Sequence, residues 1–312
     1  MRPALYIKDS ASLAALWAEA AQKVLPAYDI LTDLEGLDLD RLEVALVWKP
    51  KPGFLASLKN LRLVVSVGAG VDHIVMSDPD FPRHIPLVRM VDPGLTQGMC
   101  DYVAWACLSI LRRSRFLVEE QAAGRWKTAP LEISETKTVA VLGLGRIGLP
   151  VAQTLQGLGF KVVGWSRSPK AIEGLESYAG SEGLTTAVAQ ADMVVNLLPS
   201  TSETQDLMNA EFFAGMRPGA ALINAGRGAT VQEDDLLAAL NSGQVGEAYL
   251  DVFKVEPLPA DHPFWRHPQA MLTPHNAAIT HPSSGIRALT RALEELEAGQ
   301  PLSNLVDWDQ GY

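Results

Sequence analysis

Short apolar runs alternate with amphipathic stretches through the first third of the chain. The runs at residues 5–7, 44–48 and 63–67 have the length and content of buried strands. Residues 12–24 and 53–58 lie between them and carry the spacing of helices. Strands that alternate with helices form parallel sheets. The pattern therefore predicts a small α/β domain in this third of the chain.

The same alternation returns in the second half. We expect strands at residues 138–142, 161–165, 193–197, 221–224, 247–251 and 270–272, and helices at residues 149–158, 185–190, 210–216 and 233–242. A long apolar helix at residues 96–116 and a loop at residues 119–135 should precede these elements, and a last helix at residues 283–298 should follow them.

These elements predict an α/β fold of two Rossmann-like, doubly wound parallel-sheet domains with a cleft between them. We expect a flavodoxin-like domain from residues 1–98 together with 284–312, and a Rossmann domain from residues 99–283. The cleft between two such domains is the natural place for a small ligand.

A glycine turn is the most informative motif of the chain. Gly143, Gly145 and Gly148 form a G-x-G-x-x-G pattern between the apolar run at 138–142 and the helix that follows. The first glycine allows a tight turn, the second lets the backbone approach a pyrophosphate, and the third lets helix and strand pack closely. Such turns are common, but this one has a strand before it and a helix and a second strand after it. It therefore predicts a dinucleotide site at the positive end of a helix.

The residues after the second strand indicate which dinucleotide binds. An NAD site usually has a carboxylate about 20 residues beyond the first glycine, where it accepts bonds from ribose hydroxyls. This chain has Ser166, Arg167 and Ser168 there instead. An arginine can pair with a 2′-phosphate through charge-assisted bonds, so we predict NADP(H) in preference to NAD(H). The alternative is an ordinary solvated turn that contains a chance arginine.

Composition restricts the classes of partner. The chain has 312 residues, 47% of them hydrophobic, which suffices for two cores. Its net charge of −10 argues against nucleic acid or an anionic membrane as a partner. No apolar run reaches the roughly 18–20 residues of a membrane span, and the N-terminal segment lacks the core of a signal peptide. Cys100 and Cys107 would lie ~10 Å apart on one helix, too far for a disulfide. We expect small core residues in a cytoplasmic protein, and no metal site.

Three polar residues follow successive strands of the second half. They are Arg227, Glu256 and His275, and ligands of doubly wound sheets bind outside the carboxyl ends of strands. Reduction of a 2-keto acid needs a proton donor beside the keto oxygen, which an imidazolium supplies. A carboxylate beside the ring favours its charged form, and an arginine can bind the substrate carboxylate and polarise the carbonyl.

Each of the three has a plain alternative. His275 can cap a loop after a proline, and Glu256 can belong to a solvated turn. Arg227 lies between two glycines, which give it room and let the backbone approach a ligand. The three residues together with the glycine turn favour the catalytic interpretation.

With these motifs in order, the chain resembles the D-isomer-specific 2-hydroxyacid dehydrogenases over nearly its whole length. The motifs are residues 67–73, the glycine turn, Leu198-Pro199, Asn-x-x-Arg-Gly at 224–228, residues 250–259, and Thr-Pro-His at 273–275. The resemblance implies a homodimer and a catalytic set of Arg227, Glu256 and His275. It also implies that Gly68, Ala69 and Gly70 hold the substrate carboxylate.

The resemblance further implies the groups that bind the cofactor. Arg146 and Ile147 are expected at the pyrophosphate and Asp251 at the nicotinamide carboxamide; Leu198, Pro199, Ala225 and Ala277 complete the expected set.

Within that family, the chain is similar to the branch that reduces glyoxylate and hydroxypyruvate. Ser166–Ser168, residues 47–50 and the ending at 306–312 carry this likeness. It implies NADPH-dependent reduction of glyoxylate to glycolate and of hydroxypyruvate to D-glycerate. Trp48 either lines the substrate side of the cleft or is a core residue at a strand end. Trp126 either packs within its own chain or reaches a partner subunit's site.

Two other functions stay open from the sequence. The first is reduction of a larger 2-keto acid such as phenylpyruvate, because sequence alone fixes pocket size poorly. The second is a dinucleotide-sensing scaffold without enzymatic activity, because scaffold members of the family retain the catalytic set. The chain shows no added partner-binding extension that favours the scaffold.

Overall fold

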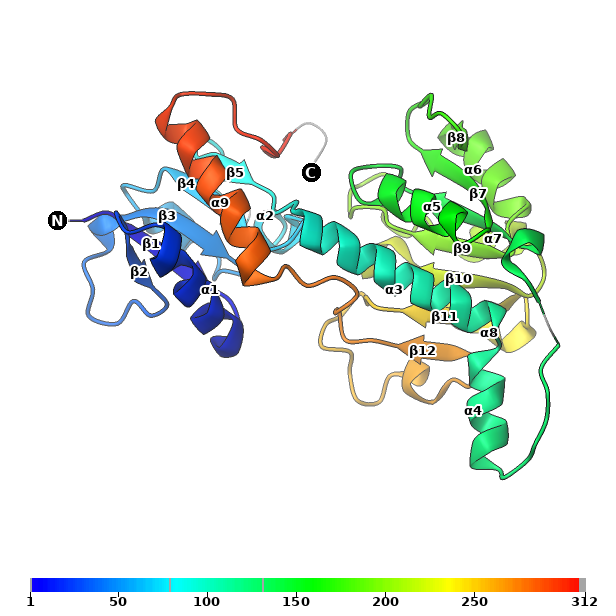
Figure 1. Cartoon of the computed structure of the whole chain (residues 1–312). Helices are drawn as coiled ribbons and strands as arrows, with labels where there is room; N and C mark the ends of the chain where they lie inside the picture. Colours follow the sequence, from blue (N-terminus) through cyan, green and yellow to red (C-terminus); the bar gives the residue numbers. More distant parts are fainter. Residues whose placement is uncertain (1, 79, 131, 309–312) are drawn as a thin grey trace. The chain divides into compact units, whose positions relative to one another are not determined.

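The computed structural model describes residues 2–78, 80–130 and 132–308, and the chain forms two compact units. The first unit is Met1–Leu95 with Ile279–Tyr312, and the second is Thr96–Ala278. Each unit contains its own parallel sheet with helices on both faces (Figure 1). The predicted α/β fold of two Rossmann-like domains is confirmed. The terminal Gly311 and Tyr312 of the motif at 306–312 lie outside the described residues.

The first unit has five parallel strands in the order β2-β1-β3-β4-β5, which is the flavodoxin-like order. The strands are β1 (Ala4–Lys8), β2 (Asp29–Leu31), β3 (Leu42–Val47), β4 (Leu63–Ser66) and β5 (Leu87–Val88). The helices are α1 (Ala11–Val24), α2 (Asp72–Val75) and α9 (Pro282–Glu297). Trp17 of α1 is fully buried. A Cβ at Gly285 would lie 2.3 Å from its ring, so this glycine lets α9 pack directly against α1.

The second unit has seven parallel strands in the order β12-β11-β10-β9-β6-β7-β8. They are β6 (Thr138–Leu142), β7 (Lys161–Ser166), β8 (Glu176–Ala179), β9 (Met193–Asn196), β10 (Ala220–Asn224), β11 (Val245–Leu250) and β12 (Ala270–Leu272). The order reverses between β6 and β9. Ligands of doubly wound sheets bind at this switch point, outside the carboxyl ends of the strands.

Helices cover both faces of the larger sheet, and its central strands β6, β9 and β10 are almost continuously apolar. They are α3 (Pro93–Leu111), α4 (Ser114–Ala122), α5 (Gly148–Gly157), α6 (Gly180–Ala189), α7 (Ala210–Gly215) and α8 (Glu233–Ser242). One hydrophobic cluster joins the sheet to α6, α7 and α8, and another joins it to α3 and α5. Cys100 and Cys107 are free and buried in the second cluster, which confirms their prediction as core residues.

Some predicted elements differ from the observed ones. The helix expected at residues 96–116 is two helices, α3 and α4, because Arg113 adopts a left-handed conformation with φ of 51° and breaks the hydrogen-bond ladder. Residues 119–122 therefore belong to α4 instead of a loop. The helix expected at residues 53–58 is a single 3₁₀ turn at Leu55–Ser57. Strands β2, β5 and β8 were not predicted.

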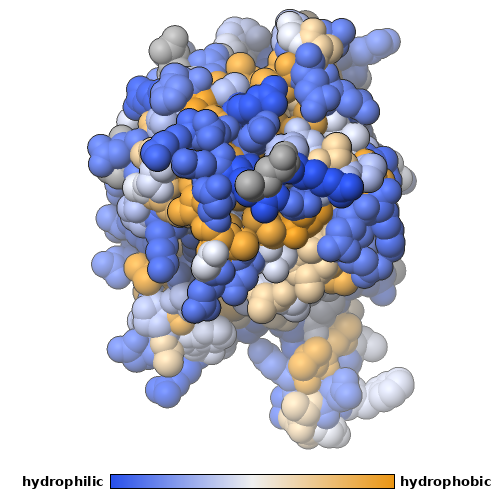
Figure 2. Space-filling model, turned by 90° about the vertical axis from the view of Figure 1, so that its left-hand side faces the viewer, coloured by the Kyte–Doolittle hydropathy of each residue, from blue (hydrophilic) through white to orange (hydrophobic). Residues whose placement is uncertain are grey.

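The molecular surface is mainly polar where it can be seen. On the side of the molecule drawn in Figure 2, hydrophilic residues surround smaller hydrophobic patches. Across the helices of residues 2–78, 80–130 and 132–308, none is both long and apolar enough to span a bilayer.

Candidate active site

The glycine turn follows β6 at the switch point of the larger sheet, and each glycine has its own structural reason. Gly143 has φ of 101°, which side chains rarely adopt. A Cβ at Gly148 would lie 1.9 Å from the Gly143 carbonyl oxygen, so helix α5 packs on the turn only because this Cβ is missing. A Cβ at Gly145 would meet nothing within 4 Å. The protein's own packing does not require Gly145, and the open space fits a pyrophosphate beside the N-terminus of α5.

Arg227 follows β10, and its two flanking glycines are needed by neighbouring loops. A Cβ at Gly226 would lie 2.8 Å from the Leu198 carbonyl oxygen, and one at Gly228 would lie 1.9 Å from the Phe253 carbonyl carbon. The glycines therefore allow the loops after β9 and β11 to press against the Arg227 backbone from two sides. The structure thus gives these glycines a packing role, and the expectation that they let the backbone approach a ligand stays a prediction.

A buried polar network also fixes the Arg227 backbone. The Thr230 hydroxyl donates to the Arg227 carbonyl at 2.6 Å. The Asn196 amide group donates to Thr230 Oγ1 at 2.7 Å and to Asn224 Oδ1 at 2.8 Å. Asn196, Asn224 and Thr230 are all buried. Sequence reasoning missed Asn196 and Thr230, because single polar residues next to apolar strands carry no specific signal.

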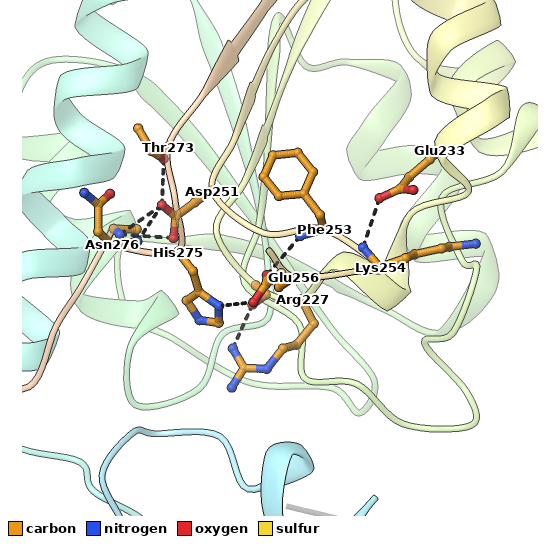
Figure 3. Close-up of polar contacts among 11 residues, drawn as sticks. Arg227, Glu233, Asp251, Phe253, Lys254, Glu256, Thr273, His275 and Asn276 are labelled. Carbon is orange, nitrogen blue, oxygen red and sulfur yellow. Dashed lines mark hydrogen bonds and ion pairs between the residues drawn. The ribbon is translucent and has the colours of Figure 1, made fainter. Parts of the chain in front are cut away.

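Glu256 and His275 form a close pair. His275 Nδ1 lies 2.7 Å from Glu256 Oε2, and the Phe253 amide donates to Glu256 Oε1 at 3.1 Å. Figure 3 shows the side chains of Arg227, Glu256 and His275 directed toward one another from the loops after β10, β11 and β12. The structure thus brings together the three residues that the sequence singled out. Because a carboxylate accepts at Nδ1, the proton of a neutral ring lies there, and Nε2 is the nitrogen suited to proton exchange.

The loop that carries His275 is organised by Asp251, which is only 2% exposed. Asp251 Oδ1 accepts hydrogen bonds from the Thr273 hydroxyl at 2.6 Å and from the Asn276 amide at 2.9 Å, and Oδ2 accepts one from the Ala277 amide at 3.0 Å (Figure 3). The His275 amide donates to the Asp251 carbonyl at 2.8 Å. These bonds hold His275 at φ of 51°, a left-handed conformation that is uncommon for a non-glycine residue. The structure therefore gives Asp251 a positioning task, and its expected contact with a nicotinamide stays a prediction.

A tyrosine on α3 extends this network. Tyr102 Oη lies 2.8 Å from Thr273 Oγ1. Since Thr273 gives its single proton to Asp251, it must accept the proton of Tyr102. Burial raises the pKa of the Tyr102 hydroxyl, so this donor stays protonated. Sequence reasoning missed Tyr102, because a tyrosine in an apolar helix has the pattern of an ordinary core residue.

The residues expected at the adenosine phosphate lie at the end of β7 and in the loop that follows it. The Ser166 hydroxyl donates to the Ser168 carbonyl at 2.8 Å. Lys170 Nζ donates to the Leu144 carbonyl of the glycine turn at 2.7 Å, which ties this loop to that turn. Arg167 lies 3.0 Å from Glu203 of the loop after β9. Four cationic or hydroxyl side chains suited to a phosphate, those of Ser166, Arg167, Ser168 and Lys170, thus lie in a segment that is tied to the glycine turn.

The residues expected to bind the substrate carboxylate belong to the first unit. The ring of Trp48 stacks on that of His73 with centroids 3.9 Å apart, and a Cβ at Gly68 would lie 3.2 Å from Trp48. Ser66 accepts from the Gly68 amide at 3.2 Å and donates to the Gly70 carbonyl at 2.8 Å. Trp48 is therefore packed at a strand end, and the substrate roles of Trp48 and Gly68–Gly70 stay predictions.

Comparison with known proteins assigns the family. The model of the D-isomer specific 2-hydroxyacid dehydrogenase, NAD binding domain, matches residues 104–277. The chain is 42% identical over 274 residues to glyoxylate/hydroxypyruvate reductase A of Serratia proteamaculans (strain 568). The aligned region covers 86% of this chain and 88% of that protein. The chain belongs to the D-isomer specific 2-hydroxyacid dehydrogenase family. It is an NAD(P)-dependent oxidoreductase.

Solved structures of the family agree over the full chain. A D-isomer specific 2-hydroxyacid dehydrogenase from Xanthobacter autotrophicus Py2, in complex with NADPH and MES, has a TM-score of 0.94 and 39% identity and covers 100% of both chains. An NADPH-dependent glyoxylate/hydroxypyruvate reductase from Sinorhizobium meliloti, in complex with NADP and sulfate, has a TM-score of 0.92 and 34% identity over 99% of this chain and 100% of that one. The resemblance stated from the sequence motifs is confirmed.

Proposed function

We propose that this dehydrogenase uses NADPH to reduce small 2-keto acids, with glyoxylate and hydroxypyruvate as the leading substrates and glycolate and D-glycerate as products. The observation that carries the proposal is the 2.7 Å contact between His275 Nδ1 and Glu256 Oε2 at the same sheet edge as Arg227 and the glycine turn. Two further findings support it. Similar proteins are glyoxylate/hydroxypyruvate reductases, and similar structures contain bound NADPH or NADP.

The chain's own residues suggest the steps. The reduced cofactor supplies a hydride when it is bound. Arg227 binds the substrate carboxylate and polarises the keto oxygen. His275 Nε2 donates a proton to the alkoxide that forms, and Glu256 stabilises the imidazolium that must exist before this transfer. Asp251 holds the imidazole in place through the loop 273–277, so that the proton lies within hydrogen-bond reach of the oxygen.

NADP(H) is the preferred cofactor in this proposal. Arg167 carries the positive charge that a 2′-phosphate needs. Ser166 at the end of β7 and Ser168 in the loop that follows add hydrogen-bonding groups. Lys170 holds this loop against the glycine turn. The open space at Gly145 supports pyrophosphate binding in the same unit.

A homodimer is the assembly that we propose. Helices α3 and α4 expose large apolar side chains at Trp105, Leu108, Leu117 and Val118, and surfaces of this kind mark protein interfaces. Trp126, in the segment after α4, is 100% exposed. The prediction that Trp126 packs within its own chain is therefore wrong. Its contact with a partner subunit stays a prediction. Sedimentation of a monomer at working concentration would contradict this assembly.

Steady-state kinetics test the proposed function. The values of kcat/KM are measured for glyoxylate, hydroxypyruvate and phenylpyruvate, first with NADPH and then with NADH. We expect the two small acids and NADPH to give the highest values. A preference for phenylpyruvate would keep the chemistry and overturn the substrate. Absence of turnover with every pair would favour the scaffold alternative.

A further inference from the structure

An ion pair crosses the switch point of the larger sheet. Arg167 lies in the loop after β7 and Glu203 in the loop after β9, and these strands flank β6 on its two sides. Arg167 Nη1 and Glu203 Oε2 are 3.0 Å apart. The glycine turn begins where β6 ends, so the pair joins the two loops on either side of the dinucleotide turn.

The loop after β9 is held by its own hydrogen bonds, and the loop after β7 is tied to the glycine turn. The Thr204 hydroxyl donates to the Pro199 carbonyl at 2.6 Å, and the Thr201 amide donates to Thr204 Oγ1 at 2.9 Å. On the other side, Lys170 binds the Leu144 carbonyl. Glu203 thus projects from an ordered turn toward the one arginine that the proposed function assigns to the 2′-phosphate.

The pair can open at low cost. The side chains of Arg167 and Glu203 are 51% and 61% exposed, and ion pairs between exposed side chains are weak. A ligand that carries a stronger negative charge can therefore take the arginine from the carboxylate.

We propose that Glu203 is a specificity-determining residue that competes with the 2′-phosphate of NADP(H) for Arg167. This inference rests on the proposed cofactor function. Glu203 holds the guanidinium before the cofactor binds, and its charge then opposes a phosphate that carries about −1.5 to −2 at neutral pH. NAD(H) has a hydroxyl in place of that phosphate and meets no such repulsion. Glu203 therefore weakens the binding of NADP(H) and makes the affinities for NADP(H) and NAD(H) more similar.

The test compares the dissociation constants of NADPH and NADH for the wild type and for Glu203→Gln. The matched control is Glu135→Gln, which removes the same charge from an exposed residue. Glu135 lies just before β6, at the amino ends of the strands, whereas Glu203 lies beyond their carboxyl ends. Titration of cofactor fluorescence gives both constants. We expect Glu203→Gln to bind NADPH about three- to tenfold more tightly, the size of a repulsion between charges a few ångströms apart near water. NADH binding and the control should stay as in the wild type.

Added salt provides a second readout. The gain of Glu203→Gln should shrink as ionic strength rises, because salt screens exposed charges. Unchanged or weaker NADPH binding in Glu203→Gln would overturn the proposal, and so would an equal gain for NADPH and NADH. An Arg167→Ala variant separates this failure from that of the proposed cofactor use. If Arg167→Ala leaves NADPH binding intact, the 2′-phosphate assignment itself is wrong.

Discussion

The hydrogen-bond chain from Tyr102 through Thr273 to Asp251 allows a prediction that can be worked in numbers. Thr273→Val removes the hydroxyl that donates to Asp251 and accepts from Tyr102. Tyr102→Phe removes only the outer donor. Both replacements keep most of the side chain's shape, so their effects report mainly on the hydrogen bonds.

The size of each effect follows from the groups involved. The Thr273–Asp251 bond is 2.6 Å long and ends on a carboxylate, a class worth about 1.5–3 kcal/mol. The Tyr102–Thr273 bond is 2.8 Å long and joins two hydroxyls, a class worth about 0.5–1.5 kcal/mol. We expect Tyr102→Phe to lower the free energy of unfolding by the second amount and Thr273→Val by about 2–4.5 kcal/mol. The Tyr102 hydroxyl acts through Thr273, so adding Tyr102→Phe to Thr273→Val should cost nothing further.

Urea unfolding of the wild type, the two single variants and the double variant measures this coupling. The turnover number of each protein, at saturating cofactor, shows whether the same bonds hold His275 in place. We expect the double variant to be as stable as Thr273→Val and to have the same turnover number. Additive losses in the double variant would refute the chain, because Tyr102 would then act independently of Thr273.

Two further predictions concern the glycine turn and a half-buried acid, Glu247. Gly145→Ala should fold as the wild type does and lose affinity for NADPH and NADH alike, and normal cofactor binding by this variant would contradict the open-site interpretation. Gly148→Ala should lower the free energy of unfolding by about 1–3 kcal/mol, because its Cβ clashes with the turn. Urea unfolding and cofactor titration check both variants. Burial raises the pKa of Glu247 from its ordinary value of 4.5, although the positive charges of Arg115 and Arg113 lower it in part. Its ionisation therefore lowers the free energy of unfolding as the pH rises through the folded-state pKa. Glu247→Gln should therefore raise the unfolding midpoint at neutral pH and not below pH about 4, and an equal change at both would contradict this.

The fold and the centre of the site could be predicted because their signals are local in the sequence. The apolar runs predicted the central strands, and Arg227, Glu256 and His275 each lie in the loop that follows such a run. The carboxyl ends of parallel strands meet at one edge of the sheet. The sequence therefore suffices to predict that these residues lie at the same edge. The pair of Glu256 and His275 confirms that placement.

The features that were missed depend on contacts between distant segments. Strands β2, β5 and β8 lie at the edges of their sheets. β2 and β8 contain no buried residue and β5 has only two residues, so none of them shows the buried apolar run that predicts a strand. Tyr102 and Thr273 are 171 residues apart, and Arg167 and Glu203 are 36 apart. The break between α3 and α4 depends on one left-handed residue, Arg113, in a segment that reads as one helix.

A single-turnover measurement of NADPH oxidation by glyoxylate, in the wild type and in His275→Gln, tests the proposed reaction most directly. Cofactor titration of the same samples gives the dissociation constant of NADPH. We expect His275→Gln to bind NADPH as the wild type does and to transfer hydride about 10²–10⁴ times more slowly, the usual contribution of a positioned proton donor. Hydride transfer at the wild-type rate in His275→Gln would contradict the role of His275 as the proton donor.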